Sequence, residues 1–337
     1  MSDQERQGIL AGGNFITDYV KVIREWPAQD TLASIVREEM SNGGGPYNVL
    51  KDIAVLAPEV SREACGLIGN DLNGDWIIED SRKNGIEVER LQRTSEASTS
   101  YTDAMTVEST GRRTFFHQRG ANALLDLEHF SFEGSNAKIF HLGYLMLLDR
   151  LDEIDDEGRT GAEKILKKAR EAGMIASVDC VSETHSRFPE VVKSAMRSAH
   201  LLFINEFECG QVLQREVVPE KEAMVKAASD LLGFAGDDAR VVLHAANGAV
   251  VTDREGRVEA LGAVALPEDM IVGATGAGDA FAAGFLLGVH EDRDPSVCLK
   301  YAVSSAAMSL SHSTPSNGMK PLADCLELIE RYGTRSF

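Results

Sequence analysis

A glycine-rich turn followed directly by a carboxylate lies in the last fifth of the chain, at Gly276-Ala277-Gly278-Asp279. The glycines let the backbone bend tightly and approach a ligand. The helix pattern that follows would point its first free amides at one spot, with the positive end of the helix dipole behind them. Asp279 would repel an anion held there unless it acts as a base. It would then take a proton from a hydroxyl group while the amides of Gly276, Ala277 and Gly278 stabilise a moving phosphoryl group.

Two other interpretations of this turn have to be weighed. One is an ordinary glycine turn with an acidic residue in the first helical turn, where carboxylates are common. The other is a dinucleotide-binding fingerprint. That fingerprint opens a first βαβ unit and is followed by an acidic residue about 20 positions on, whereas this turn comes late in the chain.

A second group of short polar and glycine residues follows predicted strands near the N-terminus: Asn14, Asp18, Gly44, Gly45 and Asn48. Consecutive glycines are costly in entropy unless the backbone must do something special, such as let a ligand sit close to it. Asn48 offers both a donor and an acceptor in the first turn of a helix. We therefore expect these residues to bind a polyhydroxylated substrate, although Asn14 or Asp18 taken alone is more often a turn residue.

The elements that must position these residues form an α/β pattern. We expect strands at 8–15, 63–69, 138–142, 174–180, 201–204, 240–244 and 248–251, and helices at 71–84, 159–172, 189–199 and 219–234. Strands that alternate with helices predict right-handed crossovers and a mostly parallel sheet covered on both faces. Ligands bind such sheets at the carboxyl ends of the strands. Four features fall there: Asp179, Asn205, Glu208 and the Gly276 turn.

Two early groups of strands, at about 17–40 and 98–118, do not fit this alternation. The first has strand character at 20–23 and 31–36, and the second is a hairpin that turns at 109–111. We expect them to form a small separate β-layer. The chain has no internal repeat or low-complexity linker, so residues 1–337 are expected to form one domain.

The composition excludes several classes of partner. The chain has 337 residues, 43% of them hydrophobic, and 34 Lys and Arg against 53 Asp and Glu, a net charge of −19. Such acidity argues against a nucleic-acid or anionic-membrane surface, and no apolar run reaches the roughly 18 residues needed to span a bilayer. Residues 1–7 are polar, with no signal-type region after them. Five scattered cysteines without CxxC spacing indicate reduced thiols and a cytoplasmic location.

In their order and separations, the motifs resemble those of the ribokinase-like (PfkB-type) carbohydrate kinases over nearly the whole chain. The resemblance rests on Gly44-Gly45-Pro46-Tyr47-Asn48, Gly66 to Asp71, Gly120-Ala121-Asn122, Asn205-Glu206-Phe207-Glu208 and Thr275 to Phe281. It implies ATP-dependent phosphorylation of a hydroxyl of a small sugar, and a primary hydroxyl is the one we expect. Asp279 would be the base, and the residues of the N-terminal group would hold the substrate.

The resemblance also implies the cofactors and the assembly. Asn205 and Glu208 would order Mg²⁺ and its waters beside the ATP phosphates, with Glu208 reaching the ion through water. Gly248 would belong to the nucleotide-binding loop. The two early strand groups would be a lid that closes over the substrate and keeps water out, and that pairs with a second copy in a homodimer.

Two stretches depart from the family pattern. Gly273-Ala274 stands where the family usually has Asp-Thr, a pair tied to a monovalent-cation site, so activation by K⁺ is open. Leu243-His244-Ala245 precedes Gly248 where a Thr-Leu-Gly loop is usual, so the threonine contact to ATP is missing. His244 itself is expected to be a core histidine.

Two alternative functions follow from these features. The departures slightly favour a sugar-binding sensor that has lost catalysis, although the retained acids of the motifs count against it. A nucleoside such as adenosine or inosine could replace the sugar, and its base would want an aromatic partner in the lid. The candidates for that partner are Tyr19, Trp26, Tyr101 and Phe116.

Overall fold

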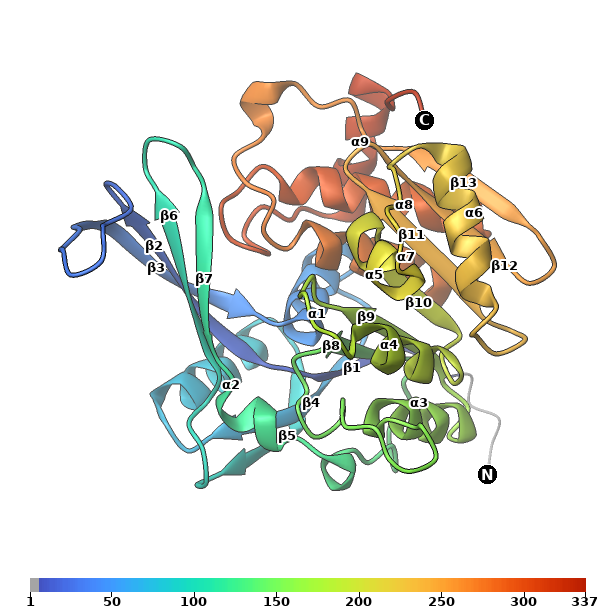
Figure 1. The fold of residues 1–337 in the computed structure, drawn as a ribbon, viewed down its shortest axis with the longest axis horizontal. Coiled ribbons are helices and arrows are strands. Elements are labelled where there is room, and N and C mark those ends of the chain that lie inside the picture. The colour runs from blue at the N-terminus through green and yellow to red at the C-terminus, as the bar shows by residue number, and fades with distance from the viewer. Residues whose placement is uncertain (1–5) are drawn as a thin grey trace.

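A nine-stranded sheet forms the centre of the protein, which we describe over residues 6–337 from a computed structural model (Figure 1). Residues 1–5, part of the polar start noted above, lie outside the described residues. The strand order is β13-β12-β11-β10-β9-β8-β1-β4-β5. The strands are β1 (Ile9–Gly13), β4 (Arg62–Gly69), β5 (Glu87–Thr94), β8 (Ile139–Leu145), β9 (Ile175–Cys180), β10 (Leu201–Asn205), β11 (Arg240–Ala245), β12 (Gly248–Asp253) and β13 (Val258–Gly262).

The predicted mostly parallel sheet is confirmed. All neighbouring strands run parallel except β11 with β12 and β12 with β13, which are antiparallel. The prediction missed both outermost strands. β5 is rich in charged residues and buries only some of its side chains, because it is an edge strand, and β13 has just five residues.

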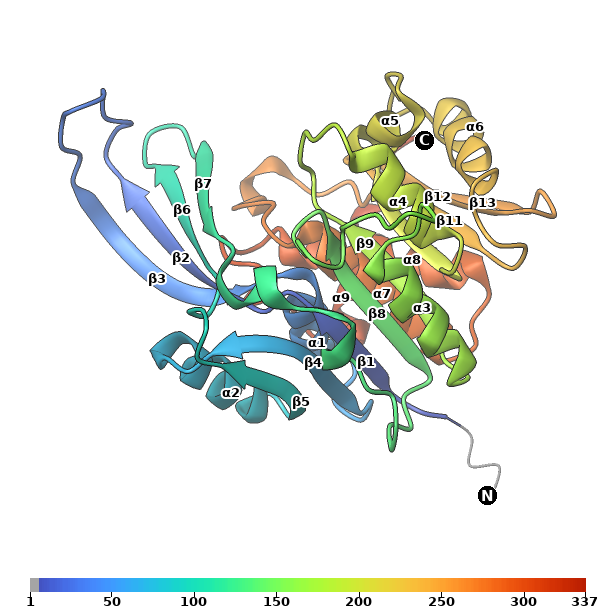
Figure 2. The same cartoon turned by 60° about the horizontal axis from the view of Figure 1, so that its bottom comes forward.

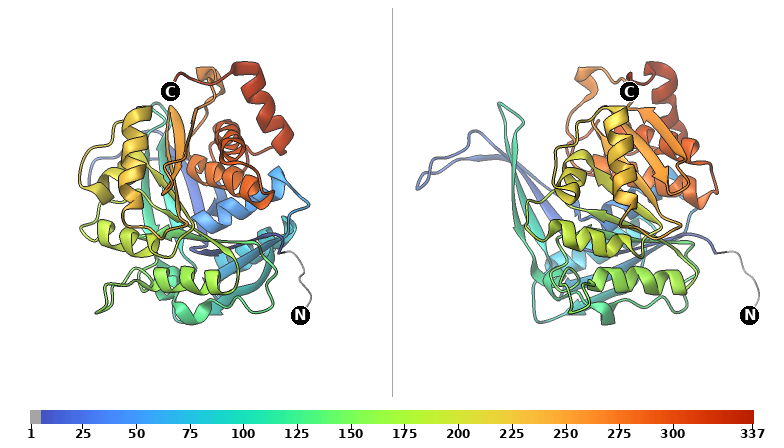
Figure 3. Two further views of the ribbon diagram at one scale, coloured as in Figure 1. Left: turned by 90° about the vertical axis from the view of Figure 1, so that its right-hand side faces the viewer. Right: turned by 45° about the vertical axis from the view of Figure 1, so that its right-hand side comes forward.

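Helices cover both faces of this sheet (Figures 2 and 3). One face carries α3 (Gly161–Glu171), α4 (Phe188–Met196), α5 (Glu206–Leu213) and α6 (Lys221–Leu232). The other carries α1 (Gly45–Leu56), α2 (Leu72–Lys83), α7 (Ala277–His290), α8 (Pro295–Ser309) and α9 (Leu322–Tyr332). Side chains of a strand alternate between faces. In β1, Leu10 accordingly joins the first core, while Ile9 and Ala11 join the second.

Local signals set where the predicted helices begin. Asp71 caps α2 by accepting a hydrogen bond from the Gly74 amide at 2.9 Å. Thr160 caps α3 in the same way through the Glu163 amide at 3.1 Å. Side-chain oxygens at this position satisfy amides that have no partner within the helix. The Gly120-Ala121-Asn122 motif lies in a short 3₁₀ helix, Gly120–Leu124.

A separate four-stranded sheet lies beside the nine-stranded sheet and its helices, which we call the main body (Figures 1 and 3). Its strand order is β3-β2-β6-β7. It consists of β2 (Ile16–Ile23), β3 (Ile35–Gly43), β6 (Tyr101–Val107) and β7 (Arg113–Gln118). The predicted small β-layer is therefore present. The expected strand at 31–36 was misplaced: β3 begins at Ile35 and runs to Gly43, because its backbone pairs with β2 as far as Ile16. Residues 41–43, which no predicted strand included, are part of β3.

Two further expectations concern the cysteines and membrane-spanning helices. All five cysteines are buried and free of disulfide bonds. A search of the helices within residues 6–337 finds none with the length and apolar character that a membrane crossing requires.

Candidate active site

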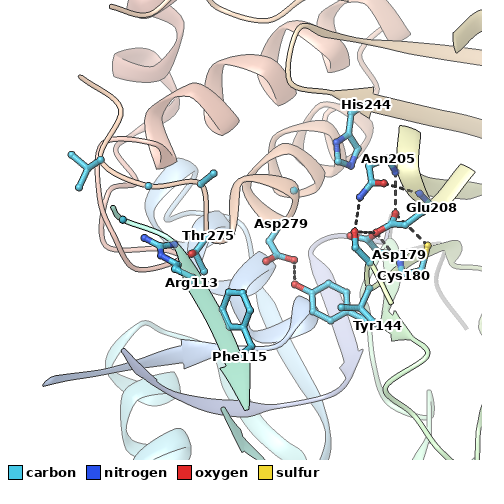
Figure 4. A pocket seen from close by; sticks show the side chains of 18 residues that line it. Arg113, Phe115, Tyr144, Asp179, Cys180, Asn205, Glu208, His244, Thr275 and Asp279 are labelled. Carbon is cyan, nitrogen blue, oxygen red and sulfur yellow. Dashed lines mark hydrogen bonds between the residues drawn. The ribbon is translucent and has the colours of Figure 1, made fainter. Parts of the chain in front are cut away.

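The carboxyl ends of the parallel strands meet the start of α7 at a cavity of about 710 Å³ (Figure 4). The main body contributes Tyr144, Asp179, Cys180, Val181, Ser182, Asn205, Glu208, His244, residues 272–276, Gly278 and Asp279. The small sheet and its turn contribute Gly111, Arg113 and Phe115. The structure thus gathers at one place the late glycine turn and the polar strand ends that were singled out in the sequence.

Asp279 is buried at the edge of this cavity, with 4% of its surface exposed. Its Oδ1 accepts a hydrogen bond from the Tyr144 hydroxyl at 2.5 Å, and its Oδ2 accepts one from Asn48 Nδ2 at 2.8 Å. Burial raises the pKa of Asp279 to about 6, although these two hydrogen bonds partly offset the shift. The carboxylate therefore ionises just below neutral pH, where a general base is both available and reactive.

Tyr144 is the residue of this group that the sequence reading missed. It lies near the end of β8, two residues beyond the predicted strand. Its backbone N–H donates to Asn14 Oδ1 at 3.0 Å, so Asn14 also fixes the position of Tyr144. Burial, and then the neighbouring charge of Asp279, raise the pKa of Tyr144 well above its ordinary value. Tyr144 therefore stays protonated and acts as a donor to Asp279.

Of the two glycines expected to bend the backbone, only Gly276 has a left-handed conformation, and Gly278 already belongs to α7. Gly276 precedes α7 with a φ of 77°, and a Cβ there would lie 2.6 Å from Pro315 Cα. The amide of Ala277 was predicted to be free, and this is wrong. Ala277 N–H donates a hydrogen bond to the Ala274 carbonyl at 3.3 Å, within the turn itself. Within residues 6–337 the amides of Gly276, Gly278 and Asp279 have no acceptor. These three remain available to an anion.

The predicted substrate residues Asn14 and Asp18 lie next to this site. Asn14 is fully buried, yet its Nδ2 has no hydrogen-bond partner among residues 6–337. Asp18 is half-buried in β2. Burial raises the pKa of Asp18 to about 7; a hydrogen bond with Thr102 lowers it, and the charge of Asp279 raises it further. A buried donor and a poorly solvated carboxyl are groups that a hydroxyl-bearing ligand can satisfy.

From the sequence we expected Gly44 and Gly45 to let a ligand sit close to the backbone. The structure leaves no open space for one there. A Cβ on Gly44 would collide with the backbone oxygen of Asn14, and one on Gly45 would lie 2.8 Å from the Tyr144 ring. The two glycines instead let the start of α1 pack against β1 and Tyr144. The two glycines therefore affect the shape of the site through this packing, on the side away from the cavity.

Asn48 is oriented by a network behind it. Asn42 Nδ2 donates to Asn48 Oδ1 at 2.7 Å and lies 3.1 Å from Ser316 Oγ. Because its oxygen is occupied in this way, Asn48 presents its NH₂ group to Asp279. Asn42 is a positioning residue that the sequence reading did not single out.

Asn205 and Glu208 lie together across the cavity from Asp279. Asn205 Oδ1 accepts from the Glu208 amide at 2.9 Å, and Glu208 Oε2 accepts from the Asn205 amide at 3.0 Å, which forms a capping box at the start of α5. Ser182 bridges the two side chains, at 2.9 Å from Asn205 Nδ2 and 2.7 Å from Glu208 Oε1. The motif thus both starts a helix and aims its polar atoms at the cavity.

Ligand atoms of Asp179, Cys180 and Glu208 lie within 4.8 Å of one another, all three residues being buried. Burial and the charges of Glu208 and Asp279 raise the pKa of Asp179 well above its ordinary value. A cation would relieve this crowding of acids. The carboxylate oxygens suit a hard ion such as Mg²⁺, whereas the thiol suits softer metals.

A second, largely apolar cavity of about 370 Å³ adjoins the first and shares His244, Ala274 and Gly278 with it. Its wall also includes Gly248, Val264, Leu266, Phe281, Val303 and Ala307. We predicted a core histidine at position 244, and this is wrong. His244 is only partly buried, and its ring packs against that of Phe281 with 4.8 Å between centroids and 31° between the ring planes. Burial lowers its pKa to about 4, so the ring is neutral at pH 7.

The aromatic residue of the small sheet that reaches the first cavity is Phe115, which was not among the four expected candidates. Trp26 and Phe116 stack on each other at 6.0 Å, and Tyr19 donates its hydroxyl to Asn73. Neighbouring residues of a strand face opposite sides of a sheet. Phe115 therefore faces the cavity, and Phe116 faces away from it.

A family model described as "pfkB family carbohydrate kinase" matches residues 13–321. The chain belongs to this family. It is 27% identical to an ATP-dependent ribose-1-phosphate kinase of Halopiger xanaduensis, over 96% of this chain and 99% of that one. It is 23% identical to a nucleoside kinase of Methanothermobacter thermautotrophicus, over 97% and 96% of the two chains. The family and these relatives identify the protein as an ATP-dependent carbohydrate kinase, of the group that acts on sugars or nucleosides.

Solved structures confirm the fold of this kinase. A ribokinase of Arabidopsis thaliana, solved with ribose and ATP, matches with a TM-score of 0.77 at 19% identity, over 96% of this chain and 99% of that one. A nucleoside kinase of Methanocaldococcus jannaschii matches with a TM-score of 0.73 at 18% identity, over 97% and 99% of the two chains.

Proposed function

We propose that this kinase transfers the γ-phosphoryl group of ATP to a hydroxyl of a small sugar, a primary hydroxyl being the expected acceptor, with Asp279 as the general base. The observation that carries the proposal is the position of Asp279. Its buried carboxylate, with a pKa raised to about 6, borders the cavity and directly follows the turn with free amides. Phosphoryl transfer leaves the protein mainly the tasks of positioning and charge stabilisation. A base beside an anion-binding turn performs both.

The hydrogen bonds to Asp279 leave room for the acceptor. Each carboxylate oxygen has more than one lone pair, so Asp279 can accept from a substrate hydroxyl while it keeps its bonds to Tyr144 and Asn48. The amides of Gly276, Gly278 and Asp279 would stabilise the charge of the transferring group. Asn14 and Asp18 would hold further hydroxyls of the sugar.

The nucleotide would extend from this turn into the apolar cavity. That cavity is large enough to take an aromatic base, and Gly248 and His244 belong to its wall. Mg²⁺ fits the other side of the site, where Asp179, Asn205 and Glu208 offer oxygen atoms. When bound, Mg²⁺ would neutralise charge on the ATP phosphates. These side chains would orient its water ligands.

A nucleoside acceptor is the second candidate, and Phe115 is the observation that favours it. Its ring lines the cavity and is 56% exposed, so it could stack on a base. The kinship to both a sugar-phosphate kinase and a nucleoside kinase fits either acceptor.

A screen of ADP release decides between these functions. Sugars, sugar phosphates and nucleosides would be offered with ATP and Mg²⁺, with and without K⁺. Turnover of sugars supports the proposal, and turnover of nucleosides alone supports the second candidate. Sugar binding without ADP release from any acceptor would contradict both and favour a sensor.

We also propose that the small sheet closes over the acceptor and pairs with a second copy of the chain. β3 is an edge strand that exposes Ile35, Val36 and Met40, and unpaired edges of this kind need cover. Light scattering should give twice the mass of the 36.6 kDa chain. Val36→Glu should shift it to the monomer, whereas Leu72→Glu on the exposed face of α2 should not. A wild-type monomer would exclude the pairing.

A further inference from the structure

Arg113 brings a positive charge from the small sheet into the first cavity. It is the first residue of β7, and it lines the cavity together with Phe115, two positions on and thus on the same face of the strand. A Cβ on Gly273 would lie 2.6 Å from Arg113 Nη2, so the guanidinium reaches the backbone that leads into the Gly276 turn. Figure 4 shows Arg113 beside Thr275 of that turn.

This guanidinium has no anionic partner in the part of the chain that is described. No carboxylate of residues 6–337 lies within 4.0 Å of it, and its side chain makes no hydrogen bond. It is half-buried, and burial is the cause that lowers its pKa. Taking a guanidinium partly out of water without a partner is unfavourable. In a chain with 53 acidic and 34 basic residues partners are plentiful, and Arg119, just beyond the other end of β7, contacts Asp149 at 2.8 Å.

The charges of the cavity limit where an anion can lie. Asp179 and Glu208 occupy the wall formed by β9 and α5, and Asp279 lies between that wall and the turn. These acids would repel an anion unless a cation intervenes. Arg113 and the free amides of Gly276 and Gly278 supply positive charge at the opposite end. An anion is therefore best accommodated between β7 and the start of α7.

We propose that Arg113 binds a phosphoryl group there, either that of ATP or one already carried by the acceptor. The proposal rests on the kinase function proposed above and adds a specificity residue that belongs to none of the motifs. The planar guanidinium can donate two parallel hydrogen bonds to phosphate oxygens. Because Arg113 belongs to the small sheet, such a ligand would also tie that sheet to the main body across the cavity.

The test compares Arg113→Gln with Arg113→Lys and with Arg112→Gln. Arg112 is the exposed neighbour in the same turn, so its variant removes the same charge without touching the cavity. Calorimetry would measure the binding of pyrophosphate, ADP and ribose 5-phosphate to each protein. We expect Arg113→Gln to weaken at least one of them by about 10- to 100-fold, the scale of a hydrogen bond to a charged group. Arg113→Lys should recover part of the loss, and Arg112→Gln should bind like the wild type.

The kinetic arm identifies the source of the phosphoryl group. A higher KM for ATP with every acceptor would assign it to the nucleotide. A higher KM for a phosphorylated acceptor alone would assign it to the acceptor. If Arg113→Gln matches Arg112→Gln in all three binding measurements and in both KM values, the proposal is overturned. The binding measurements need no turnover, so they still test whether Arg113 binds a phosphoryl group if the proposed phosphoryl transfer is wrong.

Discussion

Each oxygen of the Asp279 carboxylate receives one hydrogen bond, and each donor is itself held by an asparagine. Asn42 fixes the amide of Asn48, and Asn14 fixes the backbone of Tyr144. This arrangement directs the carboxylate and moderates the increase in its pKa that burial causes. A base whose pKa lies about one unit below neutral pH combines ionisation with useful basicity.

Tyr144→Phe tests this arrangement through the pH dependence of turnover. In the wild type, kcat/KM should rise with pH through about 6, as Asp279 loses its proton. The Tyr144 hydroxyl lowers that pKa, so its removal should move the rising limb to higher pH and reduce kcat/KM at pH 6 by about 3- to 10-fold. Tyr19→Phe, which removes a hydroxyl bound to Asn73 outside the cavity, is the control. An unshifted limb in Tyr144→Phe would show that its hydrogen bond does not tune the base.

Much of this site could be predicted at the level of single residues, because local rules act there. A carboxylate after a glycine turn and the capping pair Asn205 and Glu208 carry their signal within a few positions of sequence. Tyr144 carries none, since its role depends on β8 lying beside β1. Arg113 carries none either, since only the placement of the small sheet brings it to the cavity.

At the scale of elements, the start of α7 depends on one backbone conformation. Gly276 combines a positive φ with contact to Pro315, so a side chain there is strained and also collides. The collision would move the amides that are to hold the phosphoryl group. The sequence predicted the turn from its glycines but not the hydrogen bond from the Ala277 amide to the Ala274 carbonyl.

Gly276→Ala should therefore impair both stability and turnover. Gly158 has a similar φ of 71°, and a Cβ added there would meet no atom within 4 Å, so Gly158→Ala isolates the cost of the conformation. We expect Gly158→Ala to lower the free energy of unfolding by about 1 kcal/mol. Gly276→Ala should lower it further and reduce kcat by at least about tenfold. Equal effects of the two substitutions in chemical denaturation and in ADP release would rule out a special role for the turn.

At the scale of the whole molecule, the site concentrates acids in an already acidic protein. The pKa of Asp279 is raised to about 6, and those of Asp18 and the more distant, buried Asp152 to about 7, in each case mainly by burial. A folded state with raised acid pKa values binds protons more tightly than the unfolded chain. The stability that these acids contribute is then fully present below their unfolded pKa values and is lost as pH rises through about 6 to 7.

These acids should lower the melting temperature at about pH 8 relative to about pH 5.5, whereas the rings of His141 and His244, whose pKa values burial lowers to about 3 and about 4, act in the opposite direction. The contribution of one acid is therefore tested by its removal. Asp152→Asn should raise the melting temperature relative to the wild type by more at about pH 8 than at about pH 5.5, because it removes one of the titrating acids and keeps an acceptor for the Leu148 amide. Asp155→Asn is the control: the pKa of Asp155 is lowered to about 2, chiefly by its hydrogen bond to Lys164, so it does not titrate in this range. Equal changes in the calorimetric melting temperature of Asp152→Asn at the two pH values would contradict the expectation.

The overall architecture was the most predictable level, because the alternation of strands and helices and the chain of motifs both point to it. The register of the small sheet was less predictable from the sequence. Its strands are partly exposed and pair with distant segments, so the sequence alone misplaced β3.

Asp279→Asn tests the central claim most directly, through ADP release with an accepted substrate. The substitution keeps the shape of the side chain and removes a buried charge, so the fold and the binding of ADP should persist. Turnover should fall by about two to four orders of magnitude, the usual contribution of a general base. Near-normal turnover in a folded Asp279→Asn protein would contradict the account.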